Sequence, residues 1–232
     1  MQKSVLKSNE WFAAEALGQP AEMKAGFFVS KTPVENREEF LRAAWEAAGF
    51  GVRKPIFLKQ IHSGTIHTFL NGSLPASLLA GDAIITDSKE SFLVIQVADC
   101  MPVLFFDPVR KLVAGAHCGW KGSLLGLAKR TIEKMAELGS NPKDIRVWFG
   151  PSIRSCCYEV DVERTVLFPH LPDRQRNIDL VEFNRGLLET AGIDLQKLAI
   201  DPRCTACAAE KLPSYRREGK GAGRLFAYAA LG

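Results

Sequence analysis

The sequence predicts an α/β protein built on mixed β-sheets, and three features of the chain support this class. Short apolar runs typical of strands are interleaved with amphipathic stretches of helical period along the 232 residues. Turn signals separate several neighbouring runs, which favours antiparallel hairpins over a doubly wound parallel sheet. Apolar residues make up 47% of the chain and are evenly spread, so residues 1–232 are expected to form a single domain.

Strands are predicted where apolar runs rich in Val, Ile, Leu and Phe lie between polar or turn residues. These runs cover residues 25–30, 55–61, 65–70, 81–87, 92–97, 103–106, 112–116, 145–149 and 198–200, and the chain finishes with an apolar segment at residues 225–231. Helices are predicted where apolar side chains recur at helical spacing, over residues 33–49, 123–138 and 179–191. Pro33 favours the first turn of the first helix, and Gly139 ends the second.

The predicted hairpin around residues 107–110 holds the best candidate ligands and nucleophiles. Its Asp-Pro-Val-Arg segment is typical of a turn, with Pro at the second position and Asp able to accept local hydrogen bonds. Antiparallel pairing about this turn places residue 106 opposite residue 111 or 112. Cys100 then lies opposite His117 or Cys118, so Cys100 and His117 are expected to meet.

Composition and the N-terminal sequence indicate a cytoplasmic protein that acts on a small molecule. The formal charge is +4, with acidic and basic residues interleaved and no basic stripe carrying aromatics, so nucleic acid is not an expected partner. No run approaches the ~20 apolar residues of a membrane span, and residues 1–12 lack the apolar core of a signal peptide. Six cysteines in a chain of this length are expected to be reduced thiols.

Two pairs of cysteines lie outside the predicted hairpin. Cys156 and Cys157 are predicted to be small buried side chains, because adjacent cysteines rarely pair with each other and chelate one zinc ion poorly. Cys204 and Cys207 form a single CxxC, which without a second such pair is weak evidence for zinc or redox chemistry. Structural thiols are therefore expected at all four positions.

Several segments resemble, in order, the motifs of one known family. They are KQIHSG, GDAIITD, QVADCMPVLFFDP, VAGAHCGWKGSLLG, GPSIRSCCYEV, CTAC and SYRREGKGAGR, and they cover roughly residues 55–228. These segments are similar to the YfiH family, also called the laccase-domain or PgeF family. Its members have been described as polyphenol oxidases, purine nucleoside phosphorylases and peptidoglycan editing factors. The resemblance implies layered mixed β-sheets flanked by helices, related in fold to the deamidase domain of cytotoxic necrotizing factor toxins.

The chain also departs from the family pattern at two places. Relatives have a further cysteine where this chain has Ser152, which argues against a thiol cluster that is essential for activity. After the Phe-rich strand at residues 25–30, relatives carry an arginine and a glycine-rich segment, and the segment FFVSKTPVENREEF does not match them. Any substrate contact that relatives make there is expected to be missing.

The resemblance implies a metal site formed by His62, Cys100 and His117. Two imidazoles and one thiolate suit zinc with a fourth position left for water, and they also accept copper. Asp99, next to Cys100, is a candidate to orient a ligand histidine or to act as a base. His67 and His170 lie outside the family motifs and are predicted to be structural.

Three functions compete for these residues. The first, implied by the resemblance, is zinc-dependent phosphorolysis of adenosine, inosine or methylthioadenosine, with adenosine deamination. Phosphate would be held by Arg216 and Arg217, and by the free N–H groups of the helix predicted to start at Ser123. The second is a Cys/His hydrolase, with Cys100 as nucleophile and His117 as base, that cleaves an amide in a peptidoglycan precursor. The third is a copper polyphenol oxidase, for which four histidines are too few to add an oxygen-reducing copper cluster.

Overall fold

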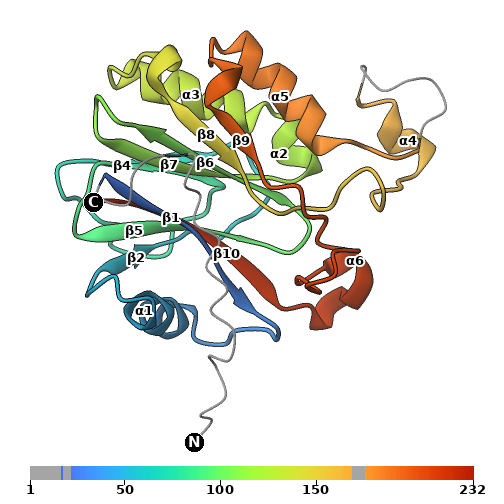
Figure 1. The fold of residues 1–232 in the computed structure, drawn as a ribbon, viewed down its shortest axis with the longest axis horizontal. Coiled ribbons are helices and arrows are strands. Elements are labelled where there is room, and N and C mark those ends of the chain that lie inside the picture. Colours follow the sequence, from blue (N-terminus) through green and yellow to red (C-terminus); the bar gives the residue numbers. More distant parts are fainter. Residues whose placement is uncertain (1–16, 18–21, 169–175) are drawn as a thin grey trace, which may run out of the picture.

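The computed structural model describes residue 17, residues 22–168 and residues 176–232, which form four layers (Figure 1). Two β-sheets lie face to face in the middle of the molecule. A helix covers the outer face of the first sheet, and further helices cover the outer face of the second. The predicted layered, mixed-sheet α/β architecture is confirmed. Because both faces of each sheet are covered, the strands are nearly continuous apolar runs.

The first sheet has the strand order β1, β10, β5 and β2. Its strands are β1 (Met23–Ser30), β10 (Arg224–Leu231), β5 (Ser91–Val97) and β2 (Lys54–Ile56). β10 pairs antiparallel with β1 and β5, whereas β2 runs parallel to β5. Helix α1 (Arg37–Ala47) is anchored to this sheet by Trp45, whose ring stacks on Phe92 with the ring centres 4.1 Å apart.

The second sheet has the strand order β3, β4, β7, β6, β8 and β9. Its strands are β3 (Ile66–Phe69), β4 (Ala83–Thr86), β7 (Leu112–Cys118), β6 (Met101–Asp107), β8 (Arg146–Phe149) and β9 (Leu198–Ile200). The pairs β3–β4 and β8–β9 are parallel and flank an antiparallel centre. The outer face packs against α3 (Leu127–Glu137) and α5 (Leu180–Thr190). Short helices are α2 (Trp120–Leu124), α4 (Val162–Thr165) and α6 (Tyr215–Glu218), with 3₁₀ turns η2 (Pro142–Asp144), η3 (Leu195–Lys197) and η4 (Gly219–Gly221).

The alternation of side chains along β6 and β7 decides which residues remain available for chemistry. Phe106 and Val113 point into the core between the sheets, while Phe105 points toward the helices. The same period of two places His117 on the side of Val113 and places Cys118 in the core beneath the helices. His117 is therefore free to face a pocket, and Cys118 is a core residue.

The register of the β6–β7 hairpin differs from the predicted one. His117 pairs with Pro102 and Cys118 pairs with Met101, so neither residue lies opposite Cys100. The reason is that the turn extends over residues 108–111. Its last residue, Lys111, is in the left-handed region with a φ of 53°, and this additional turn residue shifts the pairing.

The helix predicted over residues 123–138 is two helices. Gly126 separates α2 from α3, because it adopts a left-handed conformation with a φ of 65° that favours glycine. The N–H of Ser123 already donates to the carbonyl of Gly119 inside α2, at 2.8 Å. The prediction of a free helix start at Ser123 that binds phosphate is therefore wrong.

Two other elements are shorter than predicted. Helix α1 begins at Arg37 rather than near Pro33, because the side chain of Asn36 caps it by accepting the N–H of Glu39 at 3.2 Å. The strand predicted over residues 55–61 is limited to β2. The chain after β2 instead forms a loop that approaches the ends of β6 and β7.

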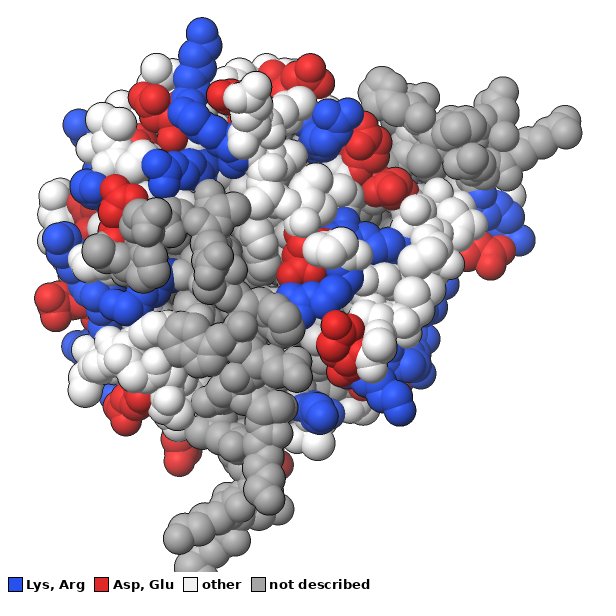
Figure 2. Space-filling view, viewed as in Figure 1, with Lys and Arg blue, Asp and Glu red and all other residues white. Residues whose placement is uncertain are grey.

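Charged side chains of both signs are interleaved on the face of the molecule shown in Figure 2. Across the described part of the chain, no helix combines the length and the apolar character that a membrane crossing requires. His67 lies in β3 with its Nε2 atom 2.9 Å from the carbonyl oxygen of Ala80, whereas His170 lies outside the described residues. Cys156 is exposed and Cys157 is half-buried, so the prediction that this pair is buried is wrong.

Candidate metal centre and substrate pocket

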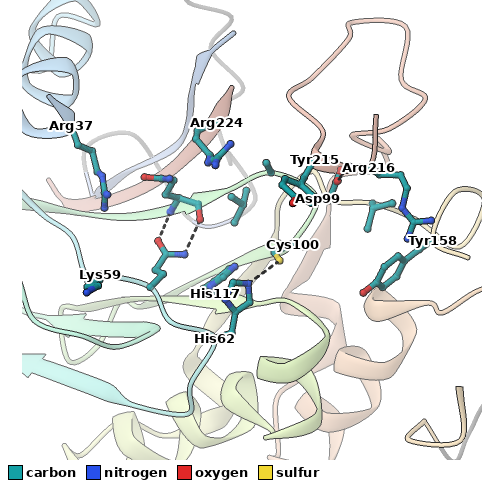
Figure 3. A pocket seen from close by; sticks show the side chains of 15 residues that line it. Arg37, Lys59, His62, Asp99, Cys100, His117, Tyr158, Tyr215, Arg216 and Arg224 are labelled. Carbon is teal, nitrogen blue, oxygen red and sulfur yellow. Dashed lines mark hydrogen bonds between the residues drawn. The ribbon is translucent and has the colours of Figure 1, made fainter. Parts of the chain in front are cut away.

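Three side chains from separate segments come together at one end of the second sheet (Figure 3). His62 lies in the loop between β2 and β3, Cys100 immediately precedes β6, and His117 lies in β7. One ligand atom from each residue lies within 4.8 Å of the other two. The Sγ of Cys100 is 4.0 Å from the Nε2 of His62, and the centres of the two imidazole rings are 4.7 Å apart. The structure thus brings together the three predicted ligands, although the hairpin register differs from the predicted one.

The backbone around these residues adopts unusual conformations. His62 and Asp99 have left-handed φ values of 59° and 81°. Residues other than glycine seldom hold this conformation unless the surrounding structure imposes it, and such residues cluster at functional sites. Gly119 permits a close approach, because a Cβ atom at this position would lie 2.6 Å from the Sγ of Cys100.

Gln60 fixes the loop that carries His62. Its side-chain NH₂ donates to the carbonyl of Gln96, and its side-chain oxygen accepts the backbone N–H of Gln96, both at 2.8 Å. The amide side chain thereby pairs with the backbone N–H and C=O of Gln96 in β5, as the backbone of a neighbouring strand would. This pairing holds the loop against the first sheet while His62 reaches toward the second.

Asp82, immediately before β4, is the buried partner of the site. Its side chain is inaccessible to solvent, and its Oδ1 lies 2.9 Å from the Nδ1 of His117. It also accepts the backbone N–H of His62 at 3.0 Å, and the N–H and hydroxyl of Ser63 at 2.6 and 2.8 Å. A carboxylate in this position orients the ring and leaves the Nε2 of His117 for a ligand or for Cys100. This role of Asp82 was not predicted from the sequence, although an acidic residue at the start of a largely apolar strand in GDAIITD was a usable signal.

The charges of these side chains depend on one another. Burial raises the pKa of the Cys100 thiol, but hydrogen bonds and charges from His117 and His62 outweigh burial and lower the pKa to about 6. Burial lowers the pKa of His117, but its contacts with Asp82 and Cys100 outweigh burial and raise the pKa to about 9. Hydrogen bonds from His117 and Ser63 likewise outweigh burial at Asp82 and lower its pKa to about 2. In the metal-free protein, Cys100 and His117 are therefore a thiolate and an imidazolium at neutral pH.

Asp99 lines the pocket, but its carboxylate is engaged with the C-terminal part of the chain. Its Oδ1 accepts the hydroxyl of Thr205, and its Oδ2 accepts the backbone N–H of Arg216, both at 2.6 Å. Asp99 therefore ties the segment before Cys100 to the segment that carries Arg216. The orienting role predicted for Asp99 belongs to Asp82 instead, because Asp82 is the carboxylate that binds a ring nitrogen of His117.

The three candidate ligands line a pocket of about 500 Å³ that also has a basic wall. The basic residues are Arg37, Lys59, Arg216 and Arg224 (Figure 3). Burial and the nearby charge of Arg224 both lower the pKa of Arg37, so these two guanidinium groups repel each other. Among the described residues, none of the four forms a salt bridge with a carboxylate. Clustered cations without acidic partners are typical of an anion-binding wall.

Arg216 and Arg217 are neighbours in α6, but they have different surroundings. The guanidinium of Arg216 lies at the pocket, 5.6 Å from the centre of the Tyr158 ring, and donates to the carbonyl of Glu159 at 2.9 Å. The guanidinium of Arg217 donates to the carbonyls of Thr205 and Ala206, at 3.0 and 2.8 Å. Of the two predicted anion-binding arginines, only Arg216 is brought to the pocket, and Arg217 braces the neighbouring loop.

The donor set fits one transition-metal ion. Zinc lies about 2.0–2.3 Å from nitrogen and sulfur ligands, so the ligand atoms of one tetrahedral ion are roughly 3.3–3.8 Å apart. The three donor atoms all lie within 4.8 Å of one another, so small side-chain rotations are enough to surround an ion. His117 also has the carboxylate partner that is usual for a metal-binding histidine. Two imidazoles and one thiolate accept either zinc or copper.

The chain is similar to known proteins over most of its length. Residues 22–232 match the family model described as multi-copper polyphenol oxidoreductase laccase. A purine nucleoside phosphorylase of Clostridium acetobutylicum is 36% identical over an alignment of 194 residues, and the match covers 77% of this chain and 78% of that protein. The purine nucleoside phosphorylase LACC1 of Mus musculus is 33% identical over an alignment of 207 residues, and the match covers 84% of this chain. The match spans 47% of the mouse protein, or about half its length.

The fold is shared with a solved member of the YfiH type. The crystal structure of the hypothetical protein YfiH of Bacillus licheniformis superposes with a TM-score of 0.79 at 30% identity, covering 97% of this chain and 100% of that one. The family resemblance predicted from the motifs is thereby confirmed. The chain belongs to the laccase-domain family, the family of YfiH that is described as multi-copper polyphenol oxidoreductase laccase.

Proposed function

We propose that this protein is a zinc-dependent purine nucleoside phosphorylase that acts on adenosine, inosine and methylthioadenosine and also deaminates adenosine. The observation that supports it best is one pocket in which His62, Cys100 and His117 lie beside arginines that form no salt bridge within the described part of the chain. The basic wall suits the anionic phosphate, and the remainder of the pocket, beside the candidate metal ligands, suits the neutral nucleoside. The relative in Clostridium acetobutylicum bears the name of this activity, which supports the same conclusion.

Phosphate would bind at Arg37 and Arg224. The guanidinium of Arg37 donates to the carbonyl of Leu58 at 3.3 Å, and that of Arg224 donates to the carbonyl of Ala222 at 2.6 Å. These bonds hold both groups in place and leave further N–H donors for a dianion. A bound dianion would also remove the repulsion between the two arginines. Arg37 therefore supplies a cation after β1, in the segment where the departure from the family pattern predicts a missing substrate contact.

The nucleoside would lie beside the metal-binding residues with its base near Tyr158. Burial and the charge of Cys100 raise the pKa of Tyr158 to about 12, so its hydroxyl remains a hydrogen-bond donor for the base or ribose. In phosphorolysis, a phosphate oxygen bonds to C1′ as the glycosidic C–N bond breaks, and the departing base takes the electron pair and gains a proton. In deamination, water replaces the amino group, which leaves as ammonia. A zinc ion bound to the three ligands would supply Lewis acidity toward substrate or water.

A Cys/His hydrolase that cleaves an amide in a peptidoglycan precursor is the second candidate, and one observation favours it. In the metal-free site, the thiolate of Cys100 contacts the imidazolium of His117, and the carboxylate of Asp82 orients the same imidazolium from its other side. These are the parts of a nucleophile, a base and its orienting group. The sulfur of Cys100 cannot serve as nucleophile while it is a metal ligand, so metal content and activity separate the two proposals.

The copper oxidase activity suggested by the family description has less support. In the described part of the chain, the histidines that line the pocket are His62 and His117. One mononuclear copper site would already use both of them together with Cys100, and an oxygen-reducing centre needs several more imidazoles. Copper bound at this site would therefore not make the protein a multicopper oxidase.

Product analysis tests the proposed function. Purified zinc-loaded protein is incubated with adenosine, with and without phosphate, and the products are separated. We expect adenine only when phosphate is present, and inosine in both samples, with part of the inosine converted to hypoxanthine where phosphate is present. His117→Ala should abolish both products, whereas His67→Ala is the matched control because the His67 ring contacts the carbonyl of Ala80 rather than the pocket. Absence of nucleoside turnover, with release of an amino acid from a muramyl peptide, would instead support the hydrolase.

A further inference from the structure

A second group of thiols lies outside the site described above. Cys156 and Cys157 lie in a turn after β8, and Cys204 and Cys207 lie in the segment after β9. A parallel bridge joins Ser152 to Cys204, and the four sulfur atoms lie within 4.8 Å of one another. We propose that these four cysteines bind one zinc ion as a tetrathiolate site that holds the two segments together.

The spacing of the sulfur atoms fits a single tetrahedral ion. Zinc–sulfur bonds are about 2.3 Å long, so two sulfurs on one zinc lie roughly 3.8 Å apart. The Sγ atoms of Cys156 and Cys207 are 3.7 Å apart and belong to free cysteines. A disulfide would require these two atoms to close to about 2.05 Å and would leave the other two thiols without a role. A cluster of several iron and sulfide ions is larger than one ion and would hold its thiolates further apart.

The turn after β8 explains how two adjacent cysteines can face one ion. The backbone N–H groups of Cys157 and Tyr158 both donate to the carbonyl of Arg154 at 2.9 Å, which curls the chain through Cys156. Adjacent side chains point to opposite sides in an extended strand, but not in a turn of this kind. Cys156 and Cys207 are exposed, so an ion from solution can reach the site without unfolding the protein.

Backbone donors prepare Cys204 to act as a thiolate ligand. The N–H of Arg154 lies 3.5 Å from its sulfur, and the N–H groups of Ala206 and Cys207 also donate to it. These donors point at the sulfur of Cys204 and suit a negatively charged ligand atom. The guanidinium of Arg154 interacts with the charges of Cys204 and Cys156, so it would offset part of the negative charge of four thiolates on a divalent ion.

The zinc site would brace one wall of the substrate pocket. Thr205, which lies between Cys204 and Cys207, donates its hydroxyl to Asp99 beside the first site. On the other segment, Tyr158 follows Cys157 directly and lines the pocket. The four thiols therefore join the segment that carries Tyr158 to the segment that supports Asp99. This role is structural and does not depend on the reaction catalysed in the pocket.

The test uses a background that lacks the first site, Cys100→Ser with His117→Ala, so that any bound metal lies elsewhere. After chelation under reducing conditions and repletion with zinc, this background should retain about one equivalent of zinc per chain. Cobalt in its place should give the intense visible absorption of a tetrahedral tetrathiolate ion. Adding Cys204→Ser and Cys207→Ser should remove the metal and this absorption. Adding Cys118→Ala should change neither, because Cys118 is a core thiol outside both groups.

A second measurement uses the unaltered protein and so does not depend on the folding of a variant. The protein is treated stepwise with an organomercurial reagent, and peptide mass spectrometry measures how far each cysteine is modified. Zinc should be released in proportion to modification of Cys156, Cys157, Cys204 and Cys207. Absence of zinc in the background variant, zinc retained after Cys204→Ser with Cys207→Ser, or iron as the bound metal would overturn the proposal. Failure of the nucleoside assay would refute the proposed function alone, because the bound metal is counted in the background variant, which lacks the first site.

Discussion

The Nδ1 atom of His117 lies 2.9 Å from the Oδ1 atom of Asp82, so the other ring nitrogen is available to the pocket. The same carboxylate accepts the backbone N–H of His62 at 3.0 Å. One buried acidic side chain therefore positions both histidines of the candidate metal centre, from strands and loops that are distant in the sequence.

Asp82→Asn should weaken zinc binding by about 10–100-fold, because a neutral amide orients the ring of His117 less firmly than a carboxylate. Competition with a chromophoric chelator measures the affinity. Asp87→Asn is a matched control, since the carboxylate of Asp87 accepts the backbone N–H of Asn71 at 2.9 Å and does not line the pocket. Equal zinc affinity in Asp82→Asn and the unaltered protein would contradict the assigned role of Asp82.

Alkylation of Cys100 in the metal-free protein should show a pH midpoint near its pKa of about 6. The thiolate is the reactive form, so the rate should rise as the pH increases through this value and then level off. His117→Ala should move the midpoint up toward the ordinary thiol value of 9.0, because the charge and hydrogen bond of His117 are lost. Iodoacetamide labelling followed by mass spectrometry measures the profile. The same midpoint in both proteins would show that the two side chains are not paired.

The shifted pKa values of Cys100 and His117 also predict how each side chain contributes to the free energy of unfolding at different pH. The pKa of Cys100 is lower in the folded protein, so its contribution is fully present above pH 9.0 and is lost as the pH falls through about 6. The pKa of His117 is raised, so its contribution is fully present below pH 6.5 and is lost as the pH rises through about 9. Urea unfolding of metal-free protein should therefore show that His117→Ala costs more stability at pH 7 than at pH 10. An equal or larger cost at pH 10 would contradict the imidazolium assignment.

Gly119→Ala should displace Cys100 and weaken metal binding, because the added Cβ atom would lie 2.6 Å from the Sγ atom. Gly186→Ala is the control, since a Cβ atom at position 186 in α5 meets no atom within 4 Å. The control should keep its zinc and gain roughly 0.5–1 kcal/mol of stability from the better helix former. Zinc titration and thermal unfolding measure the two effects, and undiminished zinc affinity in Gly119→Ala would be inconsistent with the described geometry.

Arg37→Lys and Arg224→Lys should each raise the Michaelis constant for phosphate about tenfold, because lysine keeps the charge but loses the fork of donors. Arg42→Lys is the control, because Arg42 lies on the same helix as Arg37 but pairs with Glu38 on the surface. Zinc content should be unchanged in all three variants. A phosphate dependence equal to that of the control in both pocket variants would remove these arginines from the phosphate site.

Arg217→Lys should act on stability rather than on phosphate. The guanidinium of Arg217 donates to the carbonyls of Thr205 and Ala206, so its replacement should cost about 1 kcal/mol of unfolding free energy. The Michaelis constant for phosphate should stay the same. Thermal unfolding and steady-state kinetics measure the two quantities, and the reverse outcome would return Arg217 to the anion site.

Most strands could be predicted from the sequence. Strands of sheets that are covered on both faces are continuous apolar runs, and such runs can be recognised without knowing which strands pair. Their pairing was harder to predict. One additional residue in the turn at 108–111 moved His117 opposite Pro102, and turn length is not encoded in the apolar pattern. The break at Gly126 was missed for a similar reason, since the apolar residues on both sides of it keep helical spacing.

The candidate site was predictable only where single residues lie in recognisable motifs. His62, Cys100 and His117 were found in this way. Arg37 was missed as a pocket residue because long-range packing alone brings α1 to the cavity, whereas Arg224 lies in the motif SYRREGKGAGR but was not singled out. The clustering of Cys156 with Cys207 was missed for the same reason, because it depends on two turns that follow neighbouring strands of the second sheet.

Phosphate-dependent release of adenine from adenosine is the most direct test of the central claim that the His62, Cys100 and His117 site serves a purine nucleoside phosphorylase. Chelator-washed protein is assayed before and after zinc is restored, beside Cys100→Ser and His117→Ala treated in the same way. The account predicts adenine release that requires both phosphate and zinc in the unaltered protein and is absent from both variants. Adenine release that persists in the metal-free protein, or in His117→Ala at the unaltered rate, would contradict it.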